Sequence, residues 1–186
     1  MRKPNAKERI LETAATLFHQ RGYSEVGINE IIEKAETAKA SFYQHFPSKE
    51  SLCEAWLESI HERSEKNKSN LLSSEQSPAE KIGVYFEQMA AFMKASKFRG
   101  CPYSNTGAVS DSSCGGILDQ IQGHKESIRD FFRVVCQQQF DNTERANEFG
   151  DRMFLLYSGA ATESQNLKEL WPVEVAANAA QDLLKN

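Results

Sequence analysis

The stretch KASFYQHFPSKESL, residues 39–52, decides the fold of the first part of the chain. It predicts a short helix that stops at Phe-Pro-Ser and begins again a few residues later. With Phe42 and Phe46 facing inward, a turn of about 100° per residue places Ala40 and Gln44 on the opposite side. The short helix therefore has one edge for a core and another that suits a partner outside the chain. The alternative, in which all aromatics of the stretch are ordinary core residues, stays open from these residues alone.

Apolar residues recur at the helical period of 3.6 along almost the whole sequence, and alternating strand patterns are nearly absent. This pattern predicts an all-α fold of about nine helices. Gly22 suits a helix end, and the SPAE sequence at 77–80 is typical of a capping box at a helix start. The expected helices cover or begin near residues 5–21, 28–35, 38–45, 48–66, 78–93, part of 100–116, 117–135, 143–168 and 172–184.

The 186-residue chain is 40% hydrophobic, enough to bury a core, and carries a net charge of -4. Residues 1–49 hold eight Lys and Arg against six Asp and Glu, a balance of +2 that leaves -6 for the remainder. This asymmetry permits an N-terminal region that binds nucleic acid, followed by an acidic remainder of the chain. No apolar stretch approaches the roughly 20 residues that span a bilayer, and no signal peptide is evident. We expect a cytoplasmic protein without a membrane partner.

The four cysteines are scattered, with no C-x-x-C motif and no paired histidine spacing: Cys53, Cys101, Cys114 and Cys136. This argues against a zinc site or a disulfide framework, so we expect reduced thiols, no metal and no cofactor. A Gly-rich phosphate loop, a G-x-S-x-G motif and an H-E-x-x-H motif are also missing. We therefore expect no catalytic residues and no enzyme activity.

Two short helices that follow a longer one, with a turn at Glu36-Thr37, match a helix-turn-helix unit. The second short helix of such a unit lies in the major groove of DNA. Small side chains at 40 and 41 permit a close approach to base edges, and Gln44 suits adenine. Lys39, Tyr43 and Lys49 have the reach and the donors to hold phosphates.

The segment RILETAATLFHQRGYSEVGINEIIEKAETAKASFYQHFPSKESL, residues 9–52, closely resembles the N-terminal domain of TetR-family transcriptional repressors. The resemblance implies a DNA-binding domain at 1–47 and a helical effector-binding and dimerisation domain at 48–186. It also implies a homodimer on a palindromic double-stranded DNA operator, released by an unknown small-molecule inducer. Three positions depart from the family pattern, Gly27 at the cap of the second helix, Glu36 in the turn and Ala40.

The resemblance also implies roles for individual residues. Tyr43 and Lys49 match positions that hold phosphates, and His45 lies beside the DNA backbone. The positions that face the groove are Lys39, Ala40, Ser41 and Gln44. A second hypothesis, a helical protein-interaction module without specific DNA binding, stays open, and the departures at Gly27 and Glu36 favour it.

In this family the remaining helices surround a ligand cavity, and the last two form a four-helix bundle with a second subunit. The sequences SGAAT at 158–162 and AANAA at 176–180 allow close helix approach, although ordinary packing within one chain explains them as well. The residues expected to line an apolar pocket are Phe86, Met89, Met93, Phe98, Cys101, Tyr103, Phe131, Met153 and Tyr157.

Cys101 is also a candidate thiol sensor. It follows Gly100 and lies near Lys97 and Arg99, whose positive charge favours a thiolate. Some members of the family that respond to electrophiles or oxidants carry such a Gly-Cys pair. The alternative is that Cys101 is a small buried apolar residue, while Cys53 and Cys136 are expected to be structural.

Overall fold

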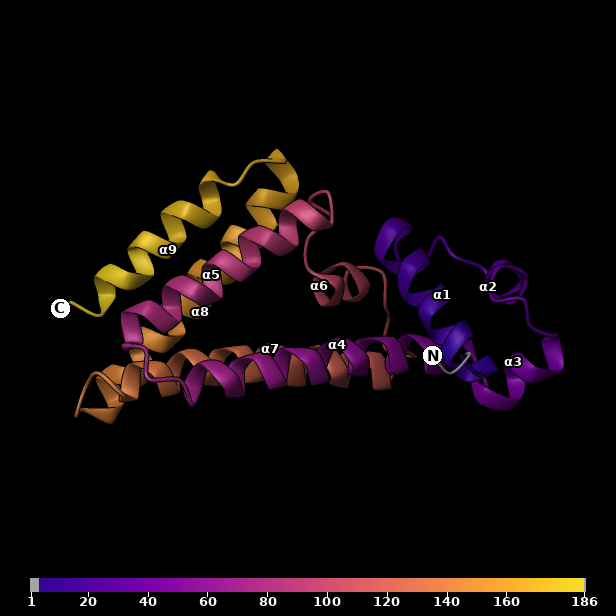
Figure 1. Cartoon of the computed structure of the whole chain (residues 1–186), viewed down its shortest axis with the longest axis horizontal. Helices are drawn as coiled ribbons and strands as arrows, with labels where there is room; N and C mark the ends of the chain where they lie inside the picture. Colours follow the sequence, from indigo (N-terminus) through magenta and orange to yellow (C-terminus); the bar gives the residue numbers. More distant parts are fainter. Residues whose placement is uncertain (1–3, 186) are drawn as a thin grey trace. The chain divides into compact units, whose positions relative to one another are not determined.

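The computed structural model describes residues 4–185, and all regular secondary structure in that part of the chain is α-helical. Nine helices follow one another along these residues, which confirms the predicted all-α fold (Figure 1). Their bounds are α1 Ala6–Arg21, α2 Ile28–Lys34, α3 Lys39–His45, α4 Lys49–Leu72, α5 Pro78–Ala95, α6 Pro102–Gly107, α7 Gly115–Gln137, α8 Thr143–Leu167 and α9 Trp171–Leu183.

The helix starts are capped as local sequence predicts. Ser77 and Glu80 form the expected capping box of α5, and Asn5 forms a second one with Glu8 at the start of α1. Ser48 caps α4, because its Oγ accepts from the Ser51 N–H at 3.1 Å. α4 continues to Leu72, further than its increasingly polar sequence after residue 65 indicated.

The chain forms two compact units. The first ends at Glu62 and also contains Pro102–Gln122, and the second contains Arg63–Cys101 and the residues from Gly123 onward. Both α4 and α7 therefore contribute residues to each unit. Among the described helices, none is long and apolar enough to cross a membrane.

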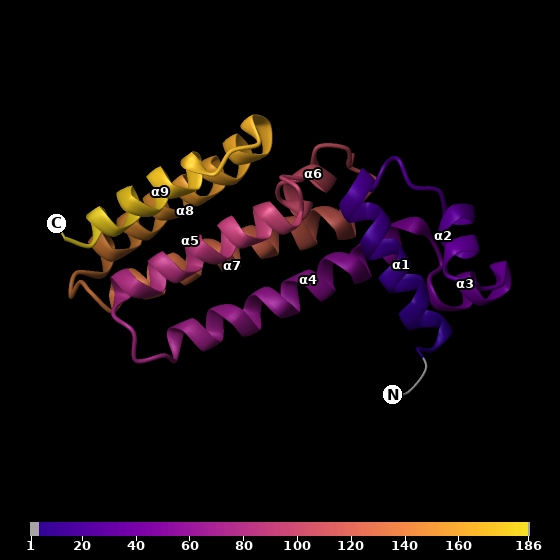
Figure 2. The same cartoon turned by 45° about the horizontal axis from the view of Figure 1, so that its top comes forward.

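The first unit is built around the apolar stripe of α1. Ile10, Leu17 and Phe18 are buried there, and the Phe18 ring centroid lies 5.4 Å from that of Trp56 in α4. α2 and α3 pack against α1, and Figure 2 shows the three helices together at the N-terminal end. Phe42, fully buried, anchors α3 in this core.

The second unit has an aromatic core between α5, α7 and α8. The Tyr85 ring lies 4.5 Å from Phe131 and stacks on Tyr157 at 5.2 Å between centroids. α8 and α9 run side by side along this unit (Figures 1 and 2), and both also pack against α5. The reversal between them uses Lys168, whose φ of 60° ends α8 in a left-handed conformation.

Candidate nucleic-acid interface and effector region

α3 has an apolar edge and a solvent-facing edge. Phe42 and Phe46 are 0% and 3% exposed, so the predicted inward edge is confirmed. The residues of the predicted groove face are more open: Lys39, Ala40, Tyr43 and Gln44 are exposed, and Ser41 and His45 are half-buried. A short helix that is fixed by two buried rings and presents small and polar side chains to solvent suits insertion into a DNA groove.

The turn between α2 and α3 contains a strained residue, Glu36, which is one of the three positions that depart from the family pattern. Glu36 has a φ of 49°, in the left-handed region where glycine is favoured. Arg9 supports this turn from α1, because its Nε donates to the Ala35 carbonyl at 3.1 Å and its Nη2 to the Glu36 carbonyl at 3.3 Å. Sequence patterns did not reveal Arg9, since a single arginine on a helix resembles an ordinary solvated charge.

The start of α2 is capped only by its backbone. Gly27 is the N-cap, with no side-chain hydrogen bond to the helix. A Cβ built on Gly27 meets nothing within 4 Å, so a serine or threonine cap would fit here. Glycine is a workable but weaker cap, and the departure at Gly27 leaves α2 in place.

Lys49 is partly held within the chain. Its Nζ lies 4.5 Å from the centroid of the Tyr23 ring and 3.4 Å from the Ser24 carbonyl oxygen. Desolvation at this half-buried position lowers the pKa of Lys49. The Tyr23 hydroxyl donates to the Glu50 carboxylate at 3.1 Å. Burial is the main cause that raises the pKa of Tyr23, and the negative charge of Glu50 is the second. Lys49 therefore lies over an aromatic ring, close to the α3 face.

The predicted pocket residues divide between the two units. Most are buried together in the second unit: Phe86, Met89, Met93, Phe131 and Met153 belong to one core cluster, with Phe98 and Tyr157 packed against it. Tyr103 belongs to the first unit, where its hydroxyl donates to the Leu57 carbonyl at 2.6 Å. The second-unit residues are therefore packed together as part of a core, whereas Tyr103 holds α6 against α4.

The second unit also buries polar groups that sequence patterns did not reveal. Lys68 is only 3% exposed and forms an ion pair with Glu65 at 2.6 Å, while its Nζ also contacts the Ser127 hydroxyl. Desolvation lowers the pKa of Lys68. Burial raises the pKa of both Tyr85 and Tyr157, the stacked tyrosines. An apolar core with several polar groups suits recognition of a small organic molecule.

Cys101 is half-buried at the end of a strained loop. The Lys125 Nζ, from α7, lies 3.7 Å from its Sγ, so a cation 24 residues away approaches the thiol. In the loop, Lys97, Phe98 and Gly100 all have positive φ, of 52°, 57° and 78°. A Cβ on Gly100 would lie 1.9 Å from the Gln165 Oε1, so this position requires glycine.

The other cysteines differ in their surroundings. Cys53 and Cys136 are buried, and desolvation raises the pKa of each to about 12. A buried thiol that stays protonated is a poor nucleophile. These two therefore have the properties of structural residues, while Cys114 is half-buried like Cys101.

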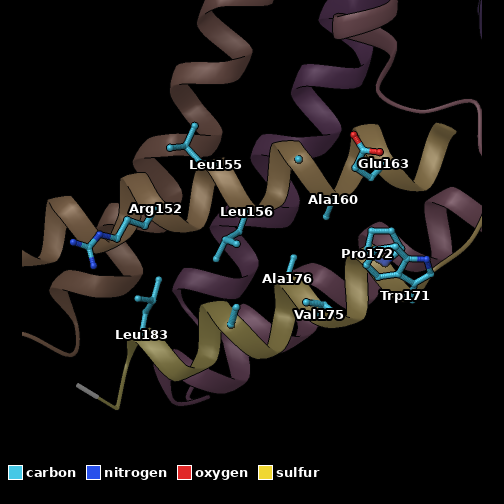
Figure 3. Close-up of a pocket in the computed structure, with 12 residues that line it drawn as sticks. Arg152, Leu155, Leu156, Ala160, Glu163, Trp171, Pro172, Val175, Ala176 and Leu183 are labelled. Atoms are coloured by element: carbon cyan, nitrogen blue, oxygen red, sulfur yellow. The ribbon is translucent and has the colours of Figure 1, made fainter. Parts of the chain in front are cut away.

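The second unit carries an open groove of about 610 Å³ between α8 and α9 (Figure 3). Exposed apolar side chains mark it, with Leu155 67%, Trp171 54% and Val175 57% exposed. Gly159, Ala160, Ala176 and Ala179, from the two predicted close-approach sequences, line it as well. Its lining is Arg152, Leu155, Leu156, Gly159, Ala160, Glu163, Trp171, Pro172, Val175, Ala176, Ala179 and Leu183.

Known proteins are similar to this chain along its whole length. The family model described as "Bacterial regulatory proteins, tetR family" matches residues 10–56. The HTH-type transcriptional regulator LmrA of Bacillus subtilis is 24% identical over 186 residues, which cover 97% of each protein. The HTH-type transcriptional repressor NemR of Escherichia coli K12 is 32% identical over 99 residues, 52% of this chain and about half of NemR's length.

Solved structures share the fold. A TetR-family transcriptional regulator from Streptomyces coelicolor superposes with a TM-score of 0.87 at 21% identity, over 97% of this chain and 94% of that one. The reduced form of E. coli NemR superposes with a TM-score of 0.79 at 21% identity, over 96% and 97% of the two chains. These relatives are transcriptional regulators rather than enzymes. The chain is therefore a DNA-binding transcriptional regulator whose residues 10–56 match the tetR family model and whose fold is that of TetR-family regulators.

Proposed function

We propose that this regulator is a repressor that binds a palindromic operator as a homodimer and is released by a small molecule or by an electrophile or oxidant. The observation that carries the proposal is the solvent-facing edge of α3, held in place by Phe42 and Phe46. DNA binding belongs to residues 1–47, and effector binding and dimerisation belong to residues 48–186. NemR, a relative over about half of its length, is named a repressor.

The contacts with DNA follow from side-chain chemistry. Ala40 and Ser41 allow α3 to approach the base edges, and Gln44 donates to and accepts from adenine. Tyr43 and Lys39 hold phosphates, as does Lys49 once it leaves the Tyr23 ring. The half-buried His45 lies beside the backbone.

Dimerisation follows from the groove between α8 and α9. Contiguous apolar surface is unfavourable in water, and Leu155, Trp171 and Val175 are exposed in it. A palindromic site requires two recognition helices about 34–36 Å apart, which a single chain does not provide. A second copy of the chain, seated on α8 and α9, satisfies both requirements.

The release signal acts on the second unit. The buried residues around Tyr85 and Tyr157 bind an organic effector, while Cys101 reacts with electrophiles or oxidants. The geometry supports the second route, because Cys101 is only half-buried and the Lys125 Nζ lies 3.7 Å from its Sγ, so that modification of the sulfur would disturb a contact between the Cys101 loop and α7. A crystal structure of NemR is described as its reduced form, so redox state is a variable in that relative.

The DNA contacts are tested by gel shift on the promoter region next to the regulator's own gene. Tyr43→Ala and Lys39→Ala should each weaken binding, and Lys39→Ala should lower the slope of log affinity against log salt by about one. Lys94→Ala, an exposed lysine of the second unit, is the control and should bind like the wild type. Unchanged binding by both α3 variants would contradict the proposed contacts.

The thiol route is tested with N-ethylmaleimide, followed by mass spectrometry and gel shift. Cys101 should be modified and DNA binding lost, whereas Cys101→Ser should bind DNA and no longer respond. Cys114→Ser is the matched control, since this thiol is equally half-buried, and it should respond like the wild type. If treated wild-type protein still binds DNA, the thiol route is wrong and the organic effector remains.

A further inference from the structure

Gly159 lies in the interior of α8, and no contact within the chain requires a glycine at this position. A Cβ built on it meets nothing within 4 Å, and the position is exposed in the groove. Gly150, in the same helix, differs, because a Cβ there would lie 2.6 Å from the backbone of Arg133. Glycine in a helix interior is destabilising relative to alanine. Gly150 is thus explained by packing between α7 and α8, whereas Gly159 leaves space for something outside the chain.

The groove has opposite charges at its two ends. Arg152 lies at one end with Leu183, and Glu163 lies at the other with Trp171 (Figure 3). Arg152 and Glu163 are eleven residues apart, about three helical turns, so both lie on one face of α8. Arg152 forms an exposed pair with Glu148, and a surface pair of this kind is weak enough to exchange partners.

We propose, on the basis of the homodimer proposed above, that the two copies of α8 cross antiparallel, with Arg152 facing the partner's Glu163. A two-fold axis allows only two arrangements of the same helix face. If the helices ran parallel, Arg152 would face the partner's Arg152 and like charges would repel. The antiparallel arrangement pairs opposite charges at both ends of the groove.

The sizes of the side chains support this register independently. If Arg152 faces the partner's Glu163, the same two-fold axis places Leu156 against the partner's Gly159. It also places Leu155 against the partner's Ala160. Each large side chain therefore meets a small one, as interdigitated packing requires. The space above Gly159 is the hole that receives a leucine, which accounts for a glycine that the single chain does not need.

The charge register is tested by sedimentation of wild-type and variant proteins at low salt. Arg152→Glu and Glu163→Arg should each weaken the dimer about tenfold, equivalent to about 1.4 kcal/mol. The double variant should regain an affinity close to that of the wild type, because both ion pairs between the subunits are restored with reversed polarity. A double variant as weak as the single ones would overturn the register.

The glycine is tested with a matched pair of substitutions. Gly159→Leu should weaken the dimer at least about tenfold, because it fills the hole for the partner's leucine. Gly123→Leu is the control, since Gly123 is also an interior helical glycine with nothing within 4 Å, and its dimer should be unchanged. Equal dimer affinity for both variants would overturn the role of Gly159. A monomeric wild type would refute the proposed homodimer. A dimeric wild type whose variants dimerise with unchanged affinity would refute only the proposed register.

Discussion

The molecule has two uncovered surfaces of opposite character, the α3 face and the groove between α8 and α9. The α3 face presents small and polar side chains around buried rings, whereas the groove presents Leu155, Trp171 and Val175 to solvent. A polar surface is stable in water without a partner. Its hydrogen-bond donors and its long side chains are therefore what indicates the partner. An exposed apolar surface is unfavourable without a cover. The difference teaches that one surface suits a reversible partner such as DNA and the other a lasting one.

Arginines hold both surfaces in place, but by different chemistry. Arg9 donates to the backbone carbonyls at the turn before α3. Arg129 and Arg133 of α7 both donate to the carboxylate of Asp151 in α8, the helix that carries the groove. The first support joins a guanidinium to neutral backbone carbonyls, whereas the second depends on an ionised carboxylate. The two supports should therefore respond differently to acid.

The largest expected effect is on the groove. Trp171→Glu replaces an exposed apolar ring of the groove with a charge, and we expect a dimer weakened by at least about 2 kcal/mol, or about 30-fold. Analytical ultracentrifugation measures the change. Val109→Glu is the control, because Val109 is 52% exposed and belongs to the first unit, whereas α8 and α9 belong to the second. Equal dissociation constants for the two variants would show that the groove is not the dimer interface.

Removal of the arginine at the α3 turn should have a smaller effect. Arg9→Ala removes two hydrogen bonds from a charged donor, so we expect the free energy of unfolding of the first unit to fall by about 1–2 kcal/mol. Urea unfolding measures the loss, and DNA binding should weaken with it. Lys7→Ala, on the exposed side of the same helix, should change neither quantity by more than about 0.5 kcal/mol. A stable Arg9→Ala protein that binds DNA normally would show that α3 does not depend on the support of Arg9.

The support of α8 should depend on pH. The hydrogen bonds from Arg129 and Arg133 hold the pKa of Asp151 well below its usual range. Their stabilisation is fully present above the unfolded-state pKa of about 3.9 and is lost as the pH falls towards the lower folded-state pKa. Asp151→Asn should cost about 1 kcal/mol at pH 7, a figure reduced for screening because Asp151 is a third exposed. Urea unfolding should show this difference shrinking below about pH 4.

The smallest expected effect is a gain at the α2–α3 turn. Glu36→Gly relieves a positive φ and removes an acid near the phosphates, so we expect about 0.5–1 kcal/mol of added stability and tighter DNA binding. Glu33→Gly lies in the last turn of α2 and should instead destabilise the protein by a similar amount. Thermal unfolding and gel shift measure the two variants. A Glu36→Gly protein that behaves like Glu33→Gly would show that the turn carries no strain.

Local sequence was enough to predict most helix positions and the inward edge of α3. Caps, glycines and the period of apolar residues act over a few residues, so Ser77, Glu80, Phe42 and Phe46 were predictable. The end of α4 was misplaced, because polar residues in its second half pack through contacts distant in sequence. Lys68 is an example, buried against Ser127 of α7.

The sequence alone determined the all-α fold and the inward edge of α3, since each follows from the period of apolar side chains within one or two helical turns. Only the tertiary structure showed the Arg9 support, the approach of Lys125 to Cys101 and the open groove. Each of these joins residues more than ten positions apart, or depends on what a side chain fails to touch. Gly159 is the sharpest case, because only the packed chain shows that nothing within it fills the space above this glycine.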